Sequence, residues 1–277
     1  MKTYIKVIIG TILLATSGSC SLDLQESFDF KPELFNEGNP FETITAWEFI
    51  QSRITERDAS NQFLLKSNTS RLDQSGDNLD FLVAAIKAVG YEDFYNQSLT
   101  SNRTYFLLNN NAFTGNNPRD IVRMIRGSQL PDGNANTGRL VNPDTFFDNW
   151  TPAQLNQLKA VLRYNIVDGY VDQNTVPTSF VHIFGKTLLP RVNLDASGAP
   201  ASLSNTIADI AFFRDGDSRQ TLRINVSGST LPATATDGGW NENVRRHNYV
   251  FNNGVGHFLN ESVRFQPYVF YSNFPLD

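Results

Sequence analysis

Histidine is the side chain best suited to acid–base or metal chemistry near neutral pH, and this 277-residue sequence contains three. His182, His247 and His257 lie far apart, and no two have the spacing of a His-x-x-x-His metal pair. His182 falls in an apolar stretch that predicts a strand. We therefore expect His182 and His257 to be packed and hydrogen-bonded, and we predict no catalytic residue, no metal ligand and no cofactor.

Two short motifs point to other ligands, and neither is complete. Gly185-Lys186-Thr187 resembles the end of a phosphate-binding loop, but that pattern needs glycine where the chain has Phe180. Asp215-Gly216-Asp217-Ser218 resembles the start of a calcium loop, but no further ligands follow at the required spacing, so we expect a turn. The carboxylate pair of a glycoside hydrolase meets in space from distant positions, so a hydrolase stays a third possibility.

The single cysteine, Cys20, follows a segment typical of an export signal. Lys2 and Lys6 precede an apolar run from Val7 to Thr16, and three small residues then lead to the cysteine. As a helix, this run of about ten residues is about 15 Å long, half the thickness of the hydrocarbon core, so it is too short to span a membrane. Residues 1–19 are therefore predicted to be a signal peptide.

Small residues that end at a lone cysteine resemble a bacterial lipobox, in which the cysteine is acylated. The resemblance implies a lipoprotein signal peptide, lipidation at Cys20 and a membrane partner bound through the lipid anchor. An ordinary buried or free thiol is the alternative. The chain has no other cysteine, so we expect no disulfide.

Residues 20–42 are predicted to be an acidic tether, with five acidic side chains against Lys31 between positions 21 and 40. An acidic stretch at this place resembles the surface-export signal of Bacteroidetes-type lipoproteins. It implies the outer membrane and the cell surface, with a periplasm-facing lipoprotein as the alternative.

The charge of the chain argues against nucleic acid as a partner. There are 23 basic and 28 acidic side chains, and removal of the signal peptide takes away Lys2 and Lys6. This leaves 21 basic against 28 acidic side chains, a net charge of −7. Because sequence-independent nucleic-acid binding depends on neutralising phosphates, we expect no nucleic-acid partner.

The segment Leu155–Val171 is the clearest structural signal, because a predicted helix runs directly into a predicted strand. Thr151 is suited to the N-cap and Pro152 to the first helical position. Apolar residues then recur at spacings of three and four, which predicts a helix with one buried stripe. From Tyr164 the spacing changes to two, which predicts a strand with a tight turn at Asp168-Gly169.

This segment and two others resemble the signature blocks of fasciclin-type domains. Residues 104–113 (TYFLLNNNAF) resemble the first block, residues 155–169 (LNQLKAVLRYNIVDG) the second, and residues 253–267 (NGVGHFLNESVRFQP) the closing block. The resemblance implies one fasciclin-like domain at residues 43–267, with an α+β fold in which helices flank a compact β-rich core. It also implies cell adhesion or extracellular interaction, without a cofactor or catalysis.

A tyrosine–histidine pair in the second block of this family is associated with adhesion. The matching residues here are Tyr164 and Asn165, which the resemblance makes the candidate interaction residues. Asparagine replaces the histidine, so the adhesive site of the family does not transfer directly.

The rest of the sequence predicts further elements around these blocks. Helices are expected after Thr45, from about Asn78 to Val89 with Asp77 as a possible cap, and at Asp120–Arg126. Strands are expected at residues 105–108, 180–184, 187–194, 207–213 and 220–226, with a hairpin turn at Asp215-Gly216.

Residues 268–277 are predicted to be a C-terminal tail. The aromatic side chains of this region are expected to pack in the core through cross-strand pairs, and a stacking surface for sugars is the alternative. They are Phe265, Tyr268, Phe270, Tyr271 and Phe274.

Taken together, these patterns predict a non-catalytic, lipid-anchored interaction module of the cell envelope, with a cell-surface protein or polysaccharide as partner. The alternative is a glycan-binding or transporter-docking accessory lipoprotein of an outer-membrane nutrient-uptake system. Residues 195–248 are longer than the corresponding part of the simplest fasciclin domains, and extra loops commonly carry specificity.

Overall fold

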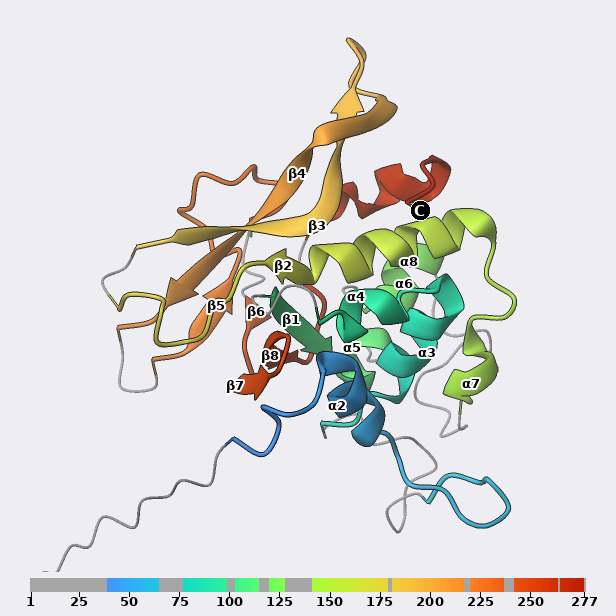
Figure 1. Ribbon diagram of the computed structural model, residues 1–277. Helices are drawn as coiled ribbons and strands as arrows, with labels where there is room; N and C mark the ends of the chain where they lie inside the picture. The colour runs from blue at the N-terminus through green and yellow to red at the C-terminus, as the bar shows by residue number, and fades with distance from the viewer. Residues whose placement is uncertain are drawn as a thin grey trace, which may run out of the picture. The chain divides into compact units, whose positions relative to one another are not determined.

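A mixed eight-stranded sheet is the centre of the fold in the computed structural model, and helices pack against it (Figure 1). The structure describes residues 39–64, 77–98, 103–114, 120–127, 141–178, 181–216, 220–236, 242–263 and 265–276. The predicted signal peptide, Cys20 and residues 20–38 of the predicted tether lie outside this part. Residues Asn39–Asp277 form one compact unit, and its mixture of helices and strands agrees with the predicted α+β class.

The helices are α2 (Ala46–Ser52), α3 (Asp80–Val89), α4 (Glu92–Asn96), α5 (Asn110–Thr114), α6 (Ile121–Arg126), α7 (Pro143–Phe146), α8 (Pro152–Tyr164) and the 3-10 helix η1 (Gln266–Asn273). The strands are β1 (Arg103–Leu108), β2 (Ile166–Asp168), β3 (Ile183–Leu194), β4 (Pro200–Arg214), β5 (Leu222–Ile224), β6 (Glu242–Asn243), β7 (Arg246–Phe251) and β8 (Gly254–Leu259). Within the described ranges, no helix is both long and apolar enough to cross a membrane.

Helix α8 begins as the sequence predicts. The Thr151 hydroxyl accepts a hydrogen bond from the backbone N–H of Gln154, whose side chain bonds back to the Thr151 N–H, so both orphan donors are satisfied. The helix continues through Tyr164, which corrects the prediction that a strand starts there. Strand β2 begins at Ile166 and ends at Asp168, before Gly169. Leu158, Val161 and Leu162 are buried, as the predicted stripe requires.

Helix α3 is also present, although its N-terminus differs from the prediction. Its N-cap is Leu79 without a side-chain hydrogen bond, and Asp77 does not cap the helix. The Asp77 carboxylate instead forms an ion pair with the guanidinium of Arg246. Gly90 ends the helix with a φ of 69°, a left-handed conformation that glycine adopts at little cost.

Strand β1 lies between β2 and β8 in the sheet order β6-β5-β4-β3-β2-β1-β8-β7. Tyr105 pairs with Ile166 in the antiparallel β1–β2 ladder, and Phe106 pairs with His257 in the parallel β1–β8 ladder. The three sequence blocks therefore supply three neighbouring strands, although they are far apart in the chain. This is the arrangement that positions α8 and its two candidate residues.

The two edges of the sheet meet where the chain passes from β6 to β7. The Val244 N–H donates to the Leu222 carbonyl of β5 over 2.8 Å, and the Arg245 N–H donates to the Phe258 carbonyl of β8 over 2.9 Å. Since β6 and β7 lie at opposite ends of the strand order, the sheet curls until its ends come together.

Strand β3 corrects the prediction of separate strands at 180–184 and 187–194. It runs unbroken from Ile183 to Leu194, and Phe180 lies outside the described residues. Gly185 and Lys186 pair with β4 in the ladder, so the Gly-Lys-Thr motif belongs to a strand and not to a phosphate loop. A Cβ at Gly185 would lie 2.6 Å from Cγ1 of Val167, so close packing on β2 requires glycine there.

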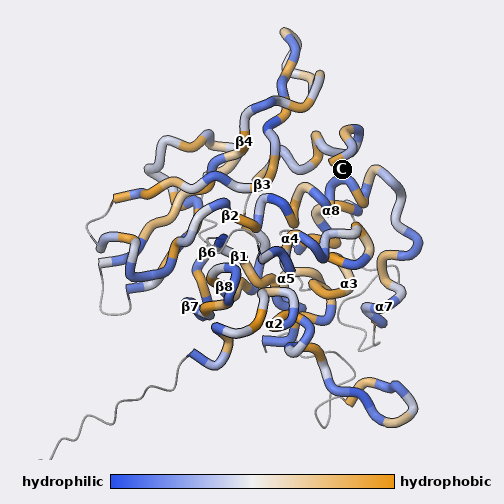
Figure 2. The backbone as a smooth tube through the Cα atoms, viewed as in Figure 1, coloured by the Kyte–Doolittle hydropathy of each residue, from blue (hydrophilic) through white to orange (hydrophobic). Residues whose placement is uncertain are grey.

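Strand β4 is longer than predicted, because it begins at Pro200 and not at Ile207. It forms a long hairpin with β3 that projects at the top of the view in Figure 1. Polar and apolar residues mix along its outer part, as Figure 2 shows, and this mixture hides the strand from a search for apolar alternation. The predicted hairpin between β4 and β5 is confirmed by the pairing of Arg214 with Leu222.

Three of the C-terminal aromatic side chains, Phe265, Tyr268 and Tyr271, pack in or against the core, as expected, but next to or within a 3-10 helix and not through strands. Tyr268 and Tyr271 are buried, and the Tyr271 hydroxyl donates to the Pro190 carbonyl over 2.5 Å. Phe265 stacks on Tyr164 with ring centroids 4.3 Å apart. The segment from 268 onward is thus packed on the sheet and α8.

Candidate functional site

Tyr164 and Asn165, the candidate interaction residues, are both fully buried. The Tyr164 hydroxyl donates to the Asp209 carbonyl over 2.9 Å and accepts from the Asn225 side-chain amide over 2.8 Å. Burial raises the pKa of Tyr164, so the hydroxyl stays neutral. The Asn165 amide donates to the Val161 carbonyl at the end of α8. The Tyr164 side chain thus connects α8 to β4 and to Asn225, whereas that of Asn165 bonds within the end of α8. Neither side chain is exposed at the surface.

The histidines occupy three different environments. His257 is buried on β8, where Nε2 lies 2.7 Å from the Val171 carbonyl and Nδ1 accepts from the Asn248 N–H, as expected for a packed, hydrogen-bonded histidine. His182 precedes β3, and its ring lies 5.1 Å from that of Phe213, but its buried Nε2 has no partner within the described residues. Burial lowers the pKa of His247. No group of three potential metal ligands occurs in the part of the chain that the structure describes.

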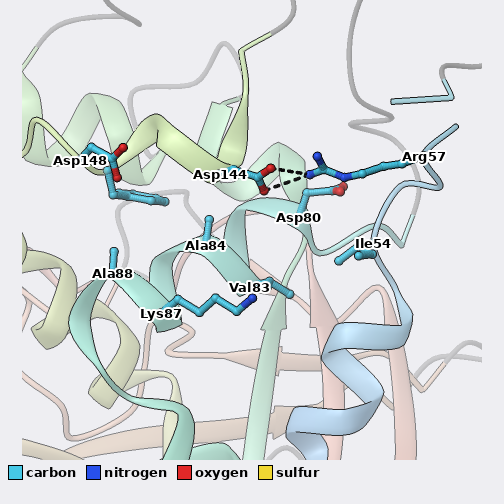
Figure 3. A pocket seen from close by; sticks show the side chains of 10 residues that line it. Ile54, Arg57, Asp80, Val83, Ala84, Lys87, Ala88, Asp144 and Asp148 are labelled. Carbon is cyan, nitrogen blue, oxygen red and sulfur yellow. Dashed lines mark hydrogen bonds and ion pairs between the residues drawn. The ribbon is translucent and has the colours of Figure 1, made fainter. Parts of the chain in front are cut away.

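A cleft of about 440 Å³ lies between α3, α7 and the segment that follows α2 (Figure 3). Its apolar lining comes from Ile54, Val83, Ala84, Ala88 and Phe147. Its charged lining comes from Arg57, Asp80, Lys87, Asp144 and Asp148. Its volume lies in the range of ligand sites, and half of its ten lining residues are charged.

Arg57 closes one end of the cleft. Its guanidinium bonds both carboxylate oxygens of Asp144, at 2.8 and 2.9 Å, as the dashed lines in Figure 3 show. The guanidinium also lies over the Phe63 ring, 3.9 Å from the centroid. The backbone of Arg57 pairs with that of Phe63 in an isolated antiparallel bridge. The Arg57 side chain therefore connects this short turn to α7. Both contacts are made by the guanidinium nitrogen Nη2.

Asp80 forms the inner wall of the cleft, and its carboxylate is already hydrogen-bonded within the protein. Its carboxylate accepts from the Thr55 N–H, the Thr55 hydroxyl and the Asn110 side-chain amide, each over 2.8 Å. Asp80 is buried in the first turn of α3, where the helix dipole favours a negative charge. These three donors join the start of α3 to the segment after α2 and to α5.

Lys87 and Asp148 are the remaining charges of the cleft, and both are exposed. Within the described residues, neither side chain forms a hydrogen bond or an ion pair. The ammonium end of Lys87 extends along α3 toward Val83, away from Asp148 (Figure 3). The cleft thus presents two uncommitted charges of opposite sign on two different walls.

No pattern in the sequence predicts this cleft. Leu82 and Ile86 of α3 are buried in the core, but the outer face of the helix, with Ala84 and Ala88, carries nothing that distinguishes a cleft from a solvated surface. Helix α7 was not predicted either. One signal for it exists, because Asn142 precedes a proline and its side chain caps the N–H of Asp144.

Comparisons with known proteins leave the family open. No family model matches the chain, and no curated protein matches it. Among solved structures, the chain is similar to a FAS1 domain pair from the insect cell adhesion molecule Fasciclin I, with 11% identity and a TM-score of 0.37. The match covers 71% of this chain and 50% of that one, so the chain spans half the length of that structure. An identity and a TM-score this low do not assign the chain to a family.

Proposed function

We propose that this protein is a non-catalytic interaction module of the fasciclin type, anchored in the cell envelope through a lipid on Cys20. The resemblance of three sequence blocks supports the type, and their meeting in the neighbouring strands β2, β1 and β8 agrees with it. The export segment and the acidic stretch before residue 43 support placement at the outer membrane, facing the cell surface. The partner is a protein or polysaccharide of that surface.

The observation that carries an interaction function is the outer part of the β3–β4 hairpin, residues 191–206, which we call the arm. Its strands pair with each other, Val192 with Leu203 and Asn193 with Ser202. The neighbouring strands β2 and β5 pair with the hairpin only nearer its base, at Thr187 and at residues 212–214. Within the described residues, both outer edges of the arm therefore lack a neighbouring strand, and such edges are templates for an added strand.

The two faces of the arm differ in polarity. Val192 pairs with Leu203 and Leu194 with Pro200, so apolar side chains share one face, whereas Asn193 and Ser202 lie on the other. Leu194 is 51% exposed. Val192 and Leu203 are partly buried against the core, and Leu194 continues this apolar face into solvent. An exposed apolar end of this kind is a surface that a partner would cover.

Cross-linking on intact cells that produce the full chain tests this function. We expect Leu194→Asp to abolish the recovery of a specific surface partner, while Asn193→Asp, which adds the same charge on the other face, leaves it unchanged. Equal recovery from both variants would contradict the role of the arm. A separate variant, Cys20→Ala, should move the protein from the membrane to the soluble fraction, and retention in the membrane would contradict the lipid anchor.

The alternative of a docking accessory for an outer-membrane nutrient-uptake system is favoured by the same arm. A strand edge docks on protein more readily than on polysaccharide, since main-chain hydrogen bonds supply the affinity. Recovery of a transporter in the cross-linking experiment would select this alternative, and recovery of an adhesion receptor or matrix component would select the first.

A further inference from the structure

We infer that the cleft between α3 and α7 binds a short peptide segment that carries one acidic and one basic side chain beside an aliphatic one. The inference deepens the proposed function and rests on it in one respect, namely that the ligand belongs to a protein partner. It requires neither the lipid anchor nor the arm. The charges of the cleft that the protein has not already paired determine the ligand.

The floor of the cleft selects an aliphatic group. Val83, Ala84 and Ala88 follow one face of α3, and their small side chains leave room above the helix. Phe147 is only 4% exposed, so its ring does not offer the open face on which a sugar stacks. Ile54 is 42% exposed at the margin, which extends the apolar surface toward solvent.

Two groups of charges in the cleft are already satisfied by the protein. Arg57 and Asp144 neutralise each other through a hydrogen bond and an ion-pair contact. Asp80 accepts from three protein donors. These residues line the cleft, but their charges need no partner from a ligand.

Lys87 and Asp148 therefore set the charge of the ligand. A purely anionic ligand would bury the Asp148 carboxylate without a counter-charge, and a purely cationic ligand would do the same to the Lys87 ammonium. A ligand that carries both charges pairs with the Lys87 ammonium and with the Asp148 carboxylate. Since the Lys87 ammonium extends toward Val83, the acidic group belongs at the Val83 end and the basic group at the Asp148 end (Figure 3).

Three capped tripeptides test the inference by NMR titration of the full chain, with the amide signals of Ala84 and Ala88 as reporters. They are acetyl-Glu-Leu-Lys-amide, acetyl-Glu-Leu-Glu-amide and acetyl-Lys-Leu-Lys-amide. We expect the mixed peptide to bind about two- to fivefold more tightly than either same-charge peptide, as half-exposed ion pairs allow. Equal affinities, or larger shifts with the neutral trisaccharide maltotriose, would overturn the inference.

Charge reversal sharpens the test, because it predicts a change of preference and not merely a loss. Lys87→Glu should make acetyl-Lys-Leu-Lys-amide the preferred peptide, and Asp148→Lys should make acetyl-Glu-Leu-Glu-amide the preferred one. Lys186→Glu and Asp93→Lys reverse exposed charges that do not line the cleft, and they should leave the preference for the mixed peptide unchanged. An unchanged preference in both cleft variants would overturn the inference.

The two proposals fail separately. If the peptides show no preference while Leu194→Asp still abolishes cross-linking, the interaction module stands and the cleft is not its peptide site. If the peptides bind as expected while Leu194→Asp has no effect on cross-linking, the binding role of the arm is refuted and the peptide site in the cleft is supported.

Discussion

Gly254 lies opposite Arg103 in the parallel β1–β8 pair, and a Cβ at Gly254 would lie only 2.0 Å from the Arg103 carbonyl oxygen. Its φ of 150° is also one that side chains rarely adopt. Both constraints apply at the start of β8, within the closing sequence block. The contact fixes how closely the two central strands approach each other.

Gly254→Ala should therefore lower the free energy of unfolding by at least about 2 kcal/mol, since backbone strain and a steric clash add. Gly198→Ala is the matched control, because Gly198 has a φ of 82° but nothing within 4 Å of its Cβ position. We expect it to cost only about 1 kcal/mol. Urea unfolding of both variants measures the difference, and equal costs would show that the clash is relieved by a small shift of β1.

Asn253, the neighbour of Gly254, connects the sheet to two helices. Its side-chain oxygen accepts from the Ala46 N–H at the start of α2, and its amide donates to the carbonyls of Tyr95 and Gln97. Asn253→Ala removes three hydrogen bonds in a fully buried place and should cost about 2–4 kcal/mol of unfolding free energy. Asn252→Ala changes an exposed neighbour and should cost less than about 0.5 kcal/mol. Similar midpoints for the two variants in urea would contradict this role.

The sequence predicts the centre of this fold better than its periphery. Helix α8 was predicted because its cap and apolar stripe are local signals, and β1 because its residues are buried on both faces and continuously apolar. The outer part of β4, residues 200–206, was missed because polar and apolar residues mix there without the alternation that marks a strand. Register and closure of the sheet depend on contacts such as Val244 with Leu222, which no local pattern encodes.

The candidate site shows the same limit. Lys87 and Asp148 are exposed charges about 60 positions apart, and they line one cleft only because α3 packs beside α7. Tyr164 and Asn165 were singled out by resemblance alone, and burial is a property that resemblance does not supply. A sequence pattern identifies side chains of the right chemistry, but the tertiary packing decides which of them face solvent.

Tyr164 should matter for stability and not for partner binding. Tyr164→Phe removes a hydroxyl that bonds Asp209 and Asn225 in the interior, which should lower the free energy of unfolding by about 1–2 kcal/mol. Recovery of the surface partner by cross-linking should stay at the wild-type level, in contrast to Leu194→Asp. Loss of the partner in a folded Tyr164→Phe variant would instead support a role of this residue in binding.

His257 should make the folded state sensitive to mild acid. Burial lowers the pKa of His257 from the ordinary 6.5 to about 4. The geometry gives a reason, because Nε2 lies against the Val171 carbonyl and Nδ1 accepts from the Asn248 N–H, so a proton on Nδ1 would face another donor. The neutral imidazole is therefore the form that the fold requires.

Between about pH 4 and pH 6.5 the unfolded chain then binds more protons at this residue than the folded protein does. Stability should fall as the pH drops through this window, by up to about 3 kcal/mol from His257, with no further loss from it below about pH 4. Carboxylates titrate near the lower end as well, so the test is the difference between wild type and His257→Gln, which keeps an amide donor but does not titrate. Urea unfolding at intervals from pH 4 to pH 7.5 should give a shallower pH dependence for the variant, and parallel curves would mean that protonation of His257 is not linked to folding.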